Sequence, residues 1–181
     1  MIIVMGLPGA GKSTVLSAAG KTDCRIVNYG DLMFDIASKS AGVKSRDEMR
    51  KLDPATQKKV QAEVGKTLAK MDGRVILDTH CSIATPKGYL PGLPHSLLSG
   101  LKVELFVLIT APVDEIMARR KTDSTRVRDS EPAEELAEHD SMNRSFLAAY
   151  SCLAGAPAAI ISNRNGKLAL AQERLLSLLK A

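Results

Sequence analysis

Aromatic residues are scarce in this chain of 181 residues, which contains three Phe, three Tyr and no Trp. Surfaces that bind single-stranded nucleic acid use aromatic rings as platforms on which the bases stack. The scarcity of such rings argues against a surface of this kind. We therefore expect no nucleic acid among the partners of the protein.

Cysteine is equally sparse, and the spacing typical of zinc sites is missing. Cys24, Cys81 and Cys152 are far apart in the sequence, and no two of them form a CxxC pair. Three separate thiols build neither a disulfide framework nor a four-thiolate zinc site. We interpret them as reduced residues of a cytoplasmic protein.

One uncharged stretch is long enough to be compared with a membrane span. It runs from Ser145 to Asn163, a length of 19 residues. Gly155 and Pro157 interrupt it, and Ser, Tyr and Asn residues make it less apolar. A helix end, a turn and a buried strand account for such a pattern better than a span, so we expect no membrane association.

The overall composition is that of a globular protein with a small basic excess. Apolar residues make up 45% of the chain, and 25 Lys and Arg oppose 20 Asp and Glu, giving a net charge of +5. The length fits one domain, 1–181, with a full hydrophobic core. The excess of positive charge favours partners that carry phosphate, either nucleic acid or small phosphorylated molecules.

Short apolar runs alternate with segments that have helical patterns, which predicts an α/β fold whose parallel sheet is covered on both faces. The predicted strands are Met1–Met5, Arg25–Tyr29, Val75–Leu77, Val103–Ile109 and Ala159–Ser162. The predicted helices are Arg46–Leu52, Pro54–Met71, Pro112–Lys121 and Leu168–Leu179. Ser45 and Asp53 stand where N-caps of the first two helices are expected.

A phosphate-binding motif follows the first predicted strand directly. Residues 6–13 read Gly-Leu-Pro-Gly-Ala-Gly-Lys-Ser, a complete G-x-x-x-x-G-K-[ST] pattern. Its glycines allow successive backbone N–H groups to face one phosphate, and the next helix points its positive end at the same anion. Lys12 is expected to reach the terminal phosphates of a nucleotide, and the hydroxyl of Ser13 to bind Mg²⁺.

A carboxylate near the metal is also expected at such a site. Asp78 follows the apolar run 75–77, at a strand end where an acidic residue holds Mg²⁺. Asp31, after the second predicted strand, is the other candidate. For Asp31 the alternative role of helix N-cap is left open.

Several motifs together resemble the archaeal type of adenylate kinase, within the nucleoside monophosphate kinases. They are residues 6–14 (GLPGAGKST), 28–31 (NYGD), 46–52 (RDEMRKL), 78–80 (DTH), 85–94 (TPKGYLPGLP) and 125–129 (TRVRD). The resemblance implies a three-layer P-loop kinase fold with a five-stranded parallel sheet. It also implies a helical AMP-binding insertion at about 30–72, a short lid at about 119–130 and a homotrimer. The implied reaction converts ATP and AMP into two ADP with Mg²⁺ as cofactor.

The resemblance also assigns residues to the site. Gly6, Leu7, Pro8, Gly9, Ala10, Gly11, Lys12, Ser13 and Thr14 would hold ATP, with Ser13 and Asp78 at the metal. Tyr29, Gly30, Asp31, Arg50, Asp78, Thr79 and His80 would form the AMP side. Lys12, Arg119, Arg126, Arg128 and Arg144 would surround the transferring phosphoryl group and act in catalysis.

The chemistry leaves other acceptors to be compared. Arginine forks bind phosphate oxygens in pairs and stabilise the charge of a transferring phosphoryl group, so several arginines favour two phosphorylated substrates. A small alcohol would instead call for a general base, for which Asp31 is the candidate. Two alternatives remain. The acceptor is another nucleoside monophosphate, or the protein has an ATP-dependent role in ribonucleoprotein assembly.

Overall fold

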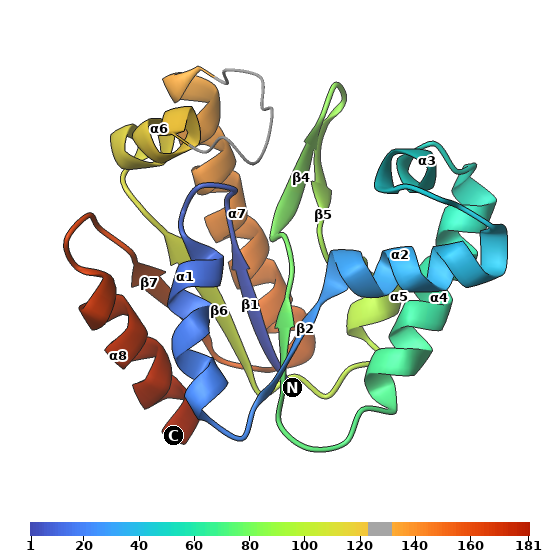
Figure 1. Ribbon diagram of the computed structural model, residues 1–181, viewed down its shortest axis with the longest axis horizontal. Helices are drawn as coiled ribbons and strands as arrows, with labels where there is room; N and C mark the ends of the chain where they lie inside the picture. The colour runs from blue at the N-terminus through green and yellow to red at the C-terminus, as the bar shows by residue number, and fades with distance from the viewer. Residues whose placement is uncertain (123–131) are drawn as a thin grey trace.

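The computed structural model describes residues 1–122 and 132–181, apart from the side chain of Arg50. Five parallel strands form its central sheet in the order β2-β3-β1-β6-β7 (Figure 1). Their bounds are β1 Ile2–Gly6, β2 Arg25–Asn28, β3 Val75–Asp78, β6 Leu105–Thr110 and β7 Ala158–Ser162. The prediction of a five-stranded parallel sheet is confirmed, and each strand lies where its apolar run was found.

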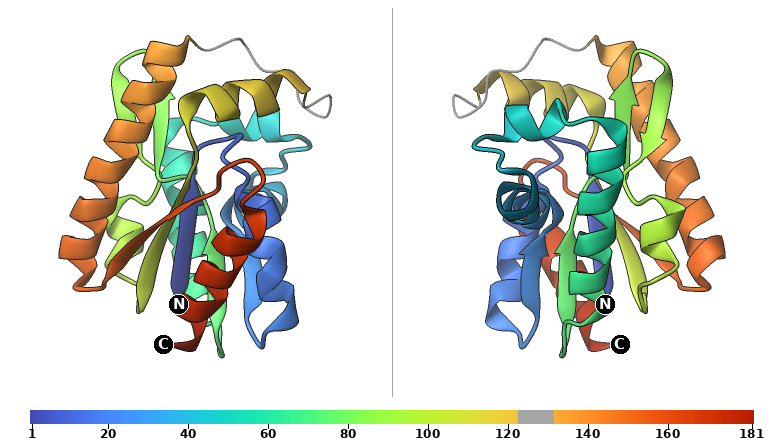
Figure 2. Two further views of the ribbon diagram at one scale, coloured as in Figure 1. Left: turned by 90° about the vertical axis from the view of Figure 1, so that its left-hand side faces the viewer. Right: turned by 90° about the vertical axis from the view of Figure 1, so that its right-hand side faces the viewer.

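Helices cover both faces of this sheet and complete three layers (Figure 2). They are α1 Lys12–Leu16, α2 Tyr29–Ala41, α3 Arg46–Arg50, α4 Pro54–Ala69, α5 His95–Leu98, α6 Val113–Thr122, α7 Ala133–Ala154 and α8 Leu168–Lys180. A 3-10 turn, Ser17–Lys21, continues α1. In Figure 1 the helices α2, α3 and α4 lie together at one side of the sheet, beyond β2.

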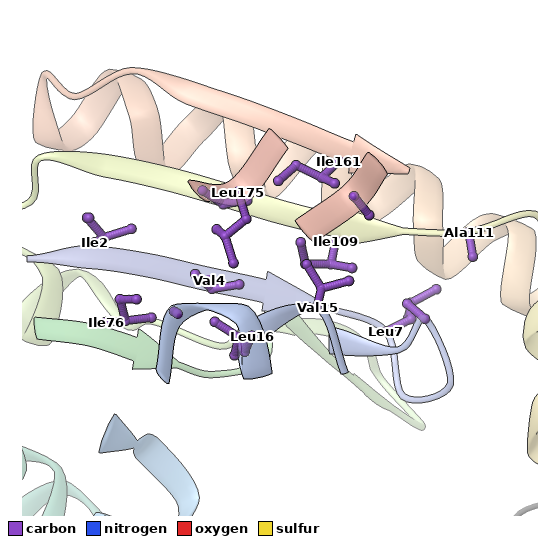
Figure 3. Packing of buried hydrophobic residues seen from close by; sticks show 14 of the residues in the cluster. Ile2, Val4, Leu7, Val15, Leu16, Ile76, Ile109, Ala111, Ile161 and Leu175 are labelled. Carbon is purple, nitrogen blue, oxygen red and sulfur yellow. The ribbon is translucent and has the colours of Figure 1, made fainter. Parts of the chain in front are cut away.

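The two faces of the sheet belong to two hydrophobic clusters because successive side chains of a strand point to opposite faces. Ile2 and Val4 of β1 join the cluster under α1 and α8, where Leu175 also lies (Figure 3). Ile3 and Met5 join the other cluster, under α4, α5 and α7. All four side chains are buried. This double burial explains why β1 reads as a continuous apolar run.

Two of the predicted helix caps are present. Asp53 accepts hydrogen bonds from the backbone N–H groups of Ala55 and Thr56, both at 3.0 Å, and α4 begins at Pro54. Ser45 accepts from the N–H of Glu48 at 3.1 Å and starts α3. Both caps satisfy N–H groups that the first helical turn leaves without a partner.

The uncharged stretch 145–163 divides as expected, with one correction. Helix α7 ends at Ala154, Gly155 adopts φ +64°, and β7 follows. The expected burial of this strand is wrong: Ile160 is 45% exposed, while Ile161 is buried. β7 is the last strand of the sheet, so one side has no neighbouring strand. Among the described residues no helix is long and apolar enough to span a membrane.

An antiparallel hairpin stands apart from the main sheet and was not predicted. Its strands are β4 Ser82–Thr85 and β5 Gly88–Pro91, which pair with each other. The turn between them consists of Pro86 and Lys87, and Gly88, with φ +107°, follows it as the first residue of β5. The hairpin rises from the carboxyl end of β3 and lies beside α7 (Figures 1 and 2).

Candidate functional site

A cavity of about 550 Å³ lies at the carboxyl edge of the sheet, where parallel α/β folds bind ligands. Its walls come from the P-loop, from the ends of β2 and β3, and from α6. The predicted residues that line it are Gly6, Leu7, Pro8, Gly9, Gly11, Lys12, Ser13, Thr14, Tyr29, Gly30, Asp78, Thr79, His80 and Arg119. The structure thus brings most of the predicted site residues together.

The backbone of the P-loop has the conformation that a phosphate cradle requires. Gly9 and Gly11 have φ angles of +94° and +81°, a region that residues with a Cβ rarely adopt. Ala10, between them, is buried, and its carbonyl accepts from Nδ2 of Asn163 at 2.9 Å. Helix α1 begins directly after Gly11, as predicted, so its N–H groups face the cavity.

Lys12 and Asp78 form an ion pair across this cavity. The side chains are 14% and 10% exposed, so the charges are largely removed from water. The other carboxylate oxygen of Asp78 accepts from Nδ2 of Asn28 at 3.0 Å. The pair compensates two charges whose burial would otherwise be costly. It also places the lysine that is expected to reach a phosphate next to the carboxylate that is expected to serve the metal.

The ends of β2 and β3 form the wall opposite the P-loop. The oxygen of the Asn28 side chain accepts from the N–H of Asp31 at 3.1 Å and caps α2. The N-cap of α2 is therefore Asn28. Asp31, for which the sequence left the role of N-cap open, lies in the first turn of the helix. Asp31 is exposed and pairs with Arg46. It does not line the cavity, whereas Arg46 does.

Tyr29 lines the same wall, and its buried hydroxyl oxygen has no hydrogen-bond partner among the described residues. Burial raises the pKa of its phenol to about 12, because the charged form would lose its hydration. The side chain packs against the hydrophobic cluster under α4 and α7. Tyr29 thus joins the apolar core to the polar cavity.

Arg119 is held firmly beside the P-loop by acceptors from several segments. Its guanidinium donates to the carbonyl of Asn163 and to the carboxylate of Glu115, both at 2.8 Å, and to the side chain of Asn165 at 2.6 Å. It also reaches the carbonyl of Ala10 at 3.4 Å. It lines both the main cavity and a smaller depression of about 200 Å³ beyond it.

Arg120 was not predicted as a site residue, yet it also contacts the P-loop. Its Nε donates to the carbonyl of Pro8 at 2.8 Å. The methylenes of the same side chain lie close to Gly9, where a Cβ would be 3.1 Å from Cγ of Arg120. The sequence signal for this residue is its place at the basic end of α6, beside Arg119.

Of the four other predicted arginines, Arg144 is the one whose side chain lies in the described part of the chain. Nε of Arg144 donates to Asp140 at 2.9 Å, and the other oxygen of that carboxylate accepts from Thr110 at 2.8 Å. Arg144 does not line the cavity in this structure. Arg126 and Arg128 lie outside the described residues. Arg50 ends α3, and its side chain is also outside the described part.

Asn163 is the structural residue that sequence reasoning missed most clearly. It is 5% exposed, directly follows β7, and links the P-loop to the end of β6 through the carbonyls of Ala10 and Thr110. A polar residue after an apolar strand is the same signal that identified Asp78. That signal was available at the end of the last strand as well.

Together, the parallel three-layer fold and the P-loop cradle define a P-loop nucleotide-binding protein. A family model described as an AAA domain matches residues 5–137. The adenylate kinase of Methanocaldococcus jannaschii is 42% identical over 188 residues, covering 99% of this chain and 98% of the relative. That of Thermoplasma acidophilum is 45% identical over 166 residues, covering 91% and 90%. The chain therefore belongs to the AAA-domain family and, more narrowly, to the family of these adenylate kinases.

Solved structures agree on the fold. The shikimate kinase of Acinetobacter baumannii in complex with shikimate has a TM-score of 0.63 at 19% identity, covering 99% of this chain and 92% of that one. The shikimate kinase of Bacteroides thetaiotaomicron has a TM-score of 0.61 at 14% identity, covering 99% and 98%. Identities this low support the predicted P-loop kinase fold and carry nothing about the acceptor.

The residues at the cradle also fit Mg²⁺. Hydroxyl and carboxylate oxygens are the ligands that Mg²⁺ prefers, and it is usually held by one or two protein groups together with phosphates and water. Ser13 lines the cavity at the start of α1, and Asp78 lines it at the end of β3. Among the described residues no cluster of three or more His, Cys, Asp or Glu forms a metal cage. The donor set therefore suits an ion that arrives with a nucleotide.

Proposed function

We propose that the protein catalyses the reversible, Mg²⁺-dependent transfer of a phosphoryl group from ATP to AMP, giving two ADP. The observation that carries the proposal is a single continuous cavity with the P-loop on one wall and the ends of β2 and β3 on the other. A nucleoside triphosphate bound to the P-loop would point its terminal phosphate at the opposite wall. His80 on that wall and Arg46, at the start of α3, both line the cavity and suit an anionic acceptor.

Positioning and charge stabilisation are the chemistry that these residues supply. Charge in the transition state of phosphoryl transfer is spread over the oxygens of the moving group. The N–H groups of residues 9–14 and the ammonium of Lys12 would stabilise that charge from the donor side. The phosphate of AMP is already ionised near neutral pH, so the reaction needs no general base. The exposed pairing of Asp31 with Arg46 agrees with this, because a base for an alcohol would face the cavity.

Mg²⁺ would be held by Ser13, with Asp78 beside it. When bound, it neutralises charge on the donor phosphates. As the metal and the nucleotide bind, Lys12 would leave Asp78 and pair with the phosphates. The ion pair of Lys12 and Asp78 thus keeps both groups in place for this exchange.

The remaining assignments concern segments that close around the substrates. We propose that residues of about 30–72 form the AMP-binding insertion and that residues of about 119–130 form the lid, with Arg126 and Arg128 on it. Arg144 would reach the phosphates from α7, next to the carboxylate of Asp140. Arg119, which lines the main cavity and reaches the carbonyl of Ala10 in the P-loop, would lie beside the transferring phosphoryl group.

A panel of acceptors tests the reaction directly. Formation of ADP from ATP and Mg²⁺ is measured with AMP, CMP, UMP, GMP and shikimate in turn. Saturable ADP formation with AMP and much slower formation with the other acceptors is the expected result. Turnover with shikimate alone would instead establish an alcohol kinase on this fold, and a preference for CMP, UMP or GMP would reassign the acceptor.

Arg50 tests the AMP side of the site. In Arg50→Ala the KM for AMP is expected to rise about tenfold or more, because a charge-assisted contact to phosphate contributes roughly 1.5–3 kcal/mol. The KM for ATP should stay unchanged. Lys51→Ala is the matched control, since Lys51 is the adjacent exposed cation. Equal effects of the two substitutions would remove Arg50 from the site.

Assembly and location complete the proposal. We propose a homotrimer, to be checked by light scattering coupled to size-exclusion chromatography, where a monomer mass would refute it. We also propose that the protein works in the cytoplasm. The three thiols of Cys24, Cys81 and Cys152 are free, which suits a reducing compartment.

A further inference from the structure

The acceptor wall, meaning Asp78, Thr79 and His80, is continuous with the hairpin β4–β5. Only Cys81 separates His80 from the first residue of β4. The hairpin is a sheet of two strands, and among the described residues it makes no pairing with the five-stranded sheet. An isolated hairpin is marginally stable in water. The sheet itself holds Asp78, the last residue of β3, and Thr79, whose N–H donates to the carbonyl of Val4 at 3.0 Å. Beyond Thr79, the direction in which the acceptor wall runs through His80 into the hairpin must therefore be fixed by other contacts.

Buried polar groups of α7 provide these contacts. Oγ of Ser82 donates to Oδ1 of Asn143 at 2.7 Å, and Sγ of Cys81 donates to the backbone carbonyl of Asn143 at 3.2 Å. Asn143 and Cys81 are each 1% exposed, and Ser82 is 4% exposed. Hydrogen bonds withdrawn from water to this extent hold their partners in one geometry, since breaking them leaves buried groups unpaired.

A second set of contacts closes the exit of the hairpin against its entry. The hydroxyl of Tyr150, also on α7, donates to the carbonyl of Cys81 at 2.7 Å. The N–H of Gly92 donates to the same carbonyl at 2.9 Å. A Cβ at Gly92 would lie 2.0 Å from the carbonyl oxygen of His80, so only glycine allows the segments before β4 and after β5 to approach here. Helix α7 thus clamps the base of the hairpin.

From this geometry we propose that Asn143 is a positioning residue, which fixes the acceptor wall through Ser82. The proposal rests on the proposed function, because it assigns the wall to AMP. Asn143 does not line the cavity. Its effect passes along the chain from Ser82 through Cys81 to His80. The P-loop is held by Asn163, Arg119 and Arg120, and it meets the acceptor wall at Asp78, which the sheet holds in place.

A double-mutant cycle tests this proposal. Ser82→Ala and Asn143→Ala are each expected to raise the KM for AMP about fivefold, the equivalent of one net hydrogen bond. The double variant should be no worse than Asn143→Ala, because both substitutions remove the same bond. The KM for ATP should stay within about twofold of wild type, as expected when the donor side is untouched. Ser145→Ala, at an exposed site on α7, is the control and should match wild type.

Binding of AMP, measured by calorimetry, and the thermal unfolding midpoint accompany the kinetics. A weaker affinity for AMP, in variants that remain folded at the assay temperature, supports the positioning role. Additive effects, or equal rises in KM for AMP and ATP, would overturn it, and so would unchanged AMP affinity despite a lower midpoint. Wild-type protein without AMP-dependent ADP formation would instead refute the proposed function, before any variant is compared.

Discussion

Gly11→Ala is the substitution for which the structure gives the most direct prediction. Gly11 has φ +81°, and a Cβ at this position would lie 2.2 Å from Nδ2 of Asn163. Asn163 cannot move away freely. Its side chain donates to the carbonyl of Ala10 at 2.9 Å, and its backbone N–H donates to the carbonyl of Thr110 at 2.7 Å. The new methyl group must therefore displace a buried amide.

The expected loss combines two terms. A left-handed conformation costs a residue with a Cβ about 1–2 kcal/mol. Breaking the bond from Asn163 to Ala10 costs about 1 kcal/mol, a moderate value because Arg119 also donates to that carbonyl. We expect the free energy of unfolding to fall by about 2–3 kcal/mol. The affinity for ATP should fall as well, because the N–H groups of the cradle would change direction.

The assay is urea unfolding of Gly11→Ala, Asn163→Ala and the double variant, with ATP binding measured by calorimetry. Asn163→Ala removes the same hydrogen bond and leaves room for the new methyl group. The double variant should therefore be about 1 kcal/mol more stable than the sum of the two losses predicts. Losses that add to within about 0.5 kcal/mol would refute the reasoning, since the two groups would then be independent.

Three further predictions concern other parts of the site. Lys12→Ala should lower the rate of ADP formation at least about a hundredfold, because a cation at the developing charge is lost; a decrease below tenfold would contradict its role. Gly92→Ala should destabilise the protein by about 1–3 kcal/mol in urea unfolding, the range for overpacked sites. Gly100→Ala, whose Cβ would have only ordinary contacts, should not. Stability should also fall as pH rises from about 9 to about 12, because burial raises the pKa of Cys81 from 9.0 and of Tyr29 from 10.0, both to about 12. Each group keeps its proton to a higher pH in the folded state. Its contribution to the free energy of unfolding is therefore complete below its unfolded pKa and is lost as the pH rises from there to its folded pKa. Urea midpoints across this range should decline less steeply for Tyr29→Phe, and an equal slope would contradict the assignment.

Local chemistry explains which parts of the fold and site were predictable. The P-loop was found because its glycines, lysine and serine act at fixed spacing within one strand–loop–helix unit. Asp78 was found because the carboxyl ends of parallel strands meet at one edge of a sheet. Asp53 and Ser45 were found because a cap bonds to N–H groups two or three residues away. In each case the cause and its effect lie close together in sequence.

Contacts between distant segments were not predictable in the same way. The bond of Asn163 to Ala10 joins residues 153 positions apart, and the bond of Ser82 to Asn143 spans 61. Neither the hydrophobic periodicity nor the motif spacing of the sequence indicates such a pair. The exposure of β7 has the same origin, because its apolar residues cannot indicate whether a strand lies at the centre or the edge of the sheet.

The same distinction shows how the site is supported. The donor side depends on groups from α6 and the loop after β7, whereas the acceptor side depends on α7 through the hairpin. Asp78 lies where the two supports meet, paired with Lys12 on one side and Asn28 on the other. Substitutions in either support should therefore change one substrate constant at a time. Substitution of Asp78 should change both, since it removes a partner from each side.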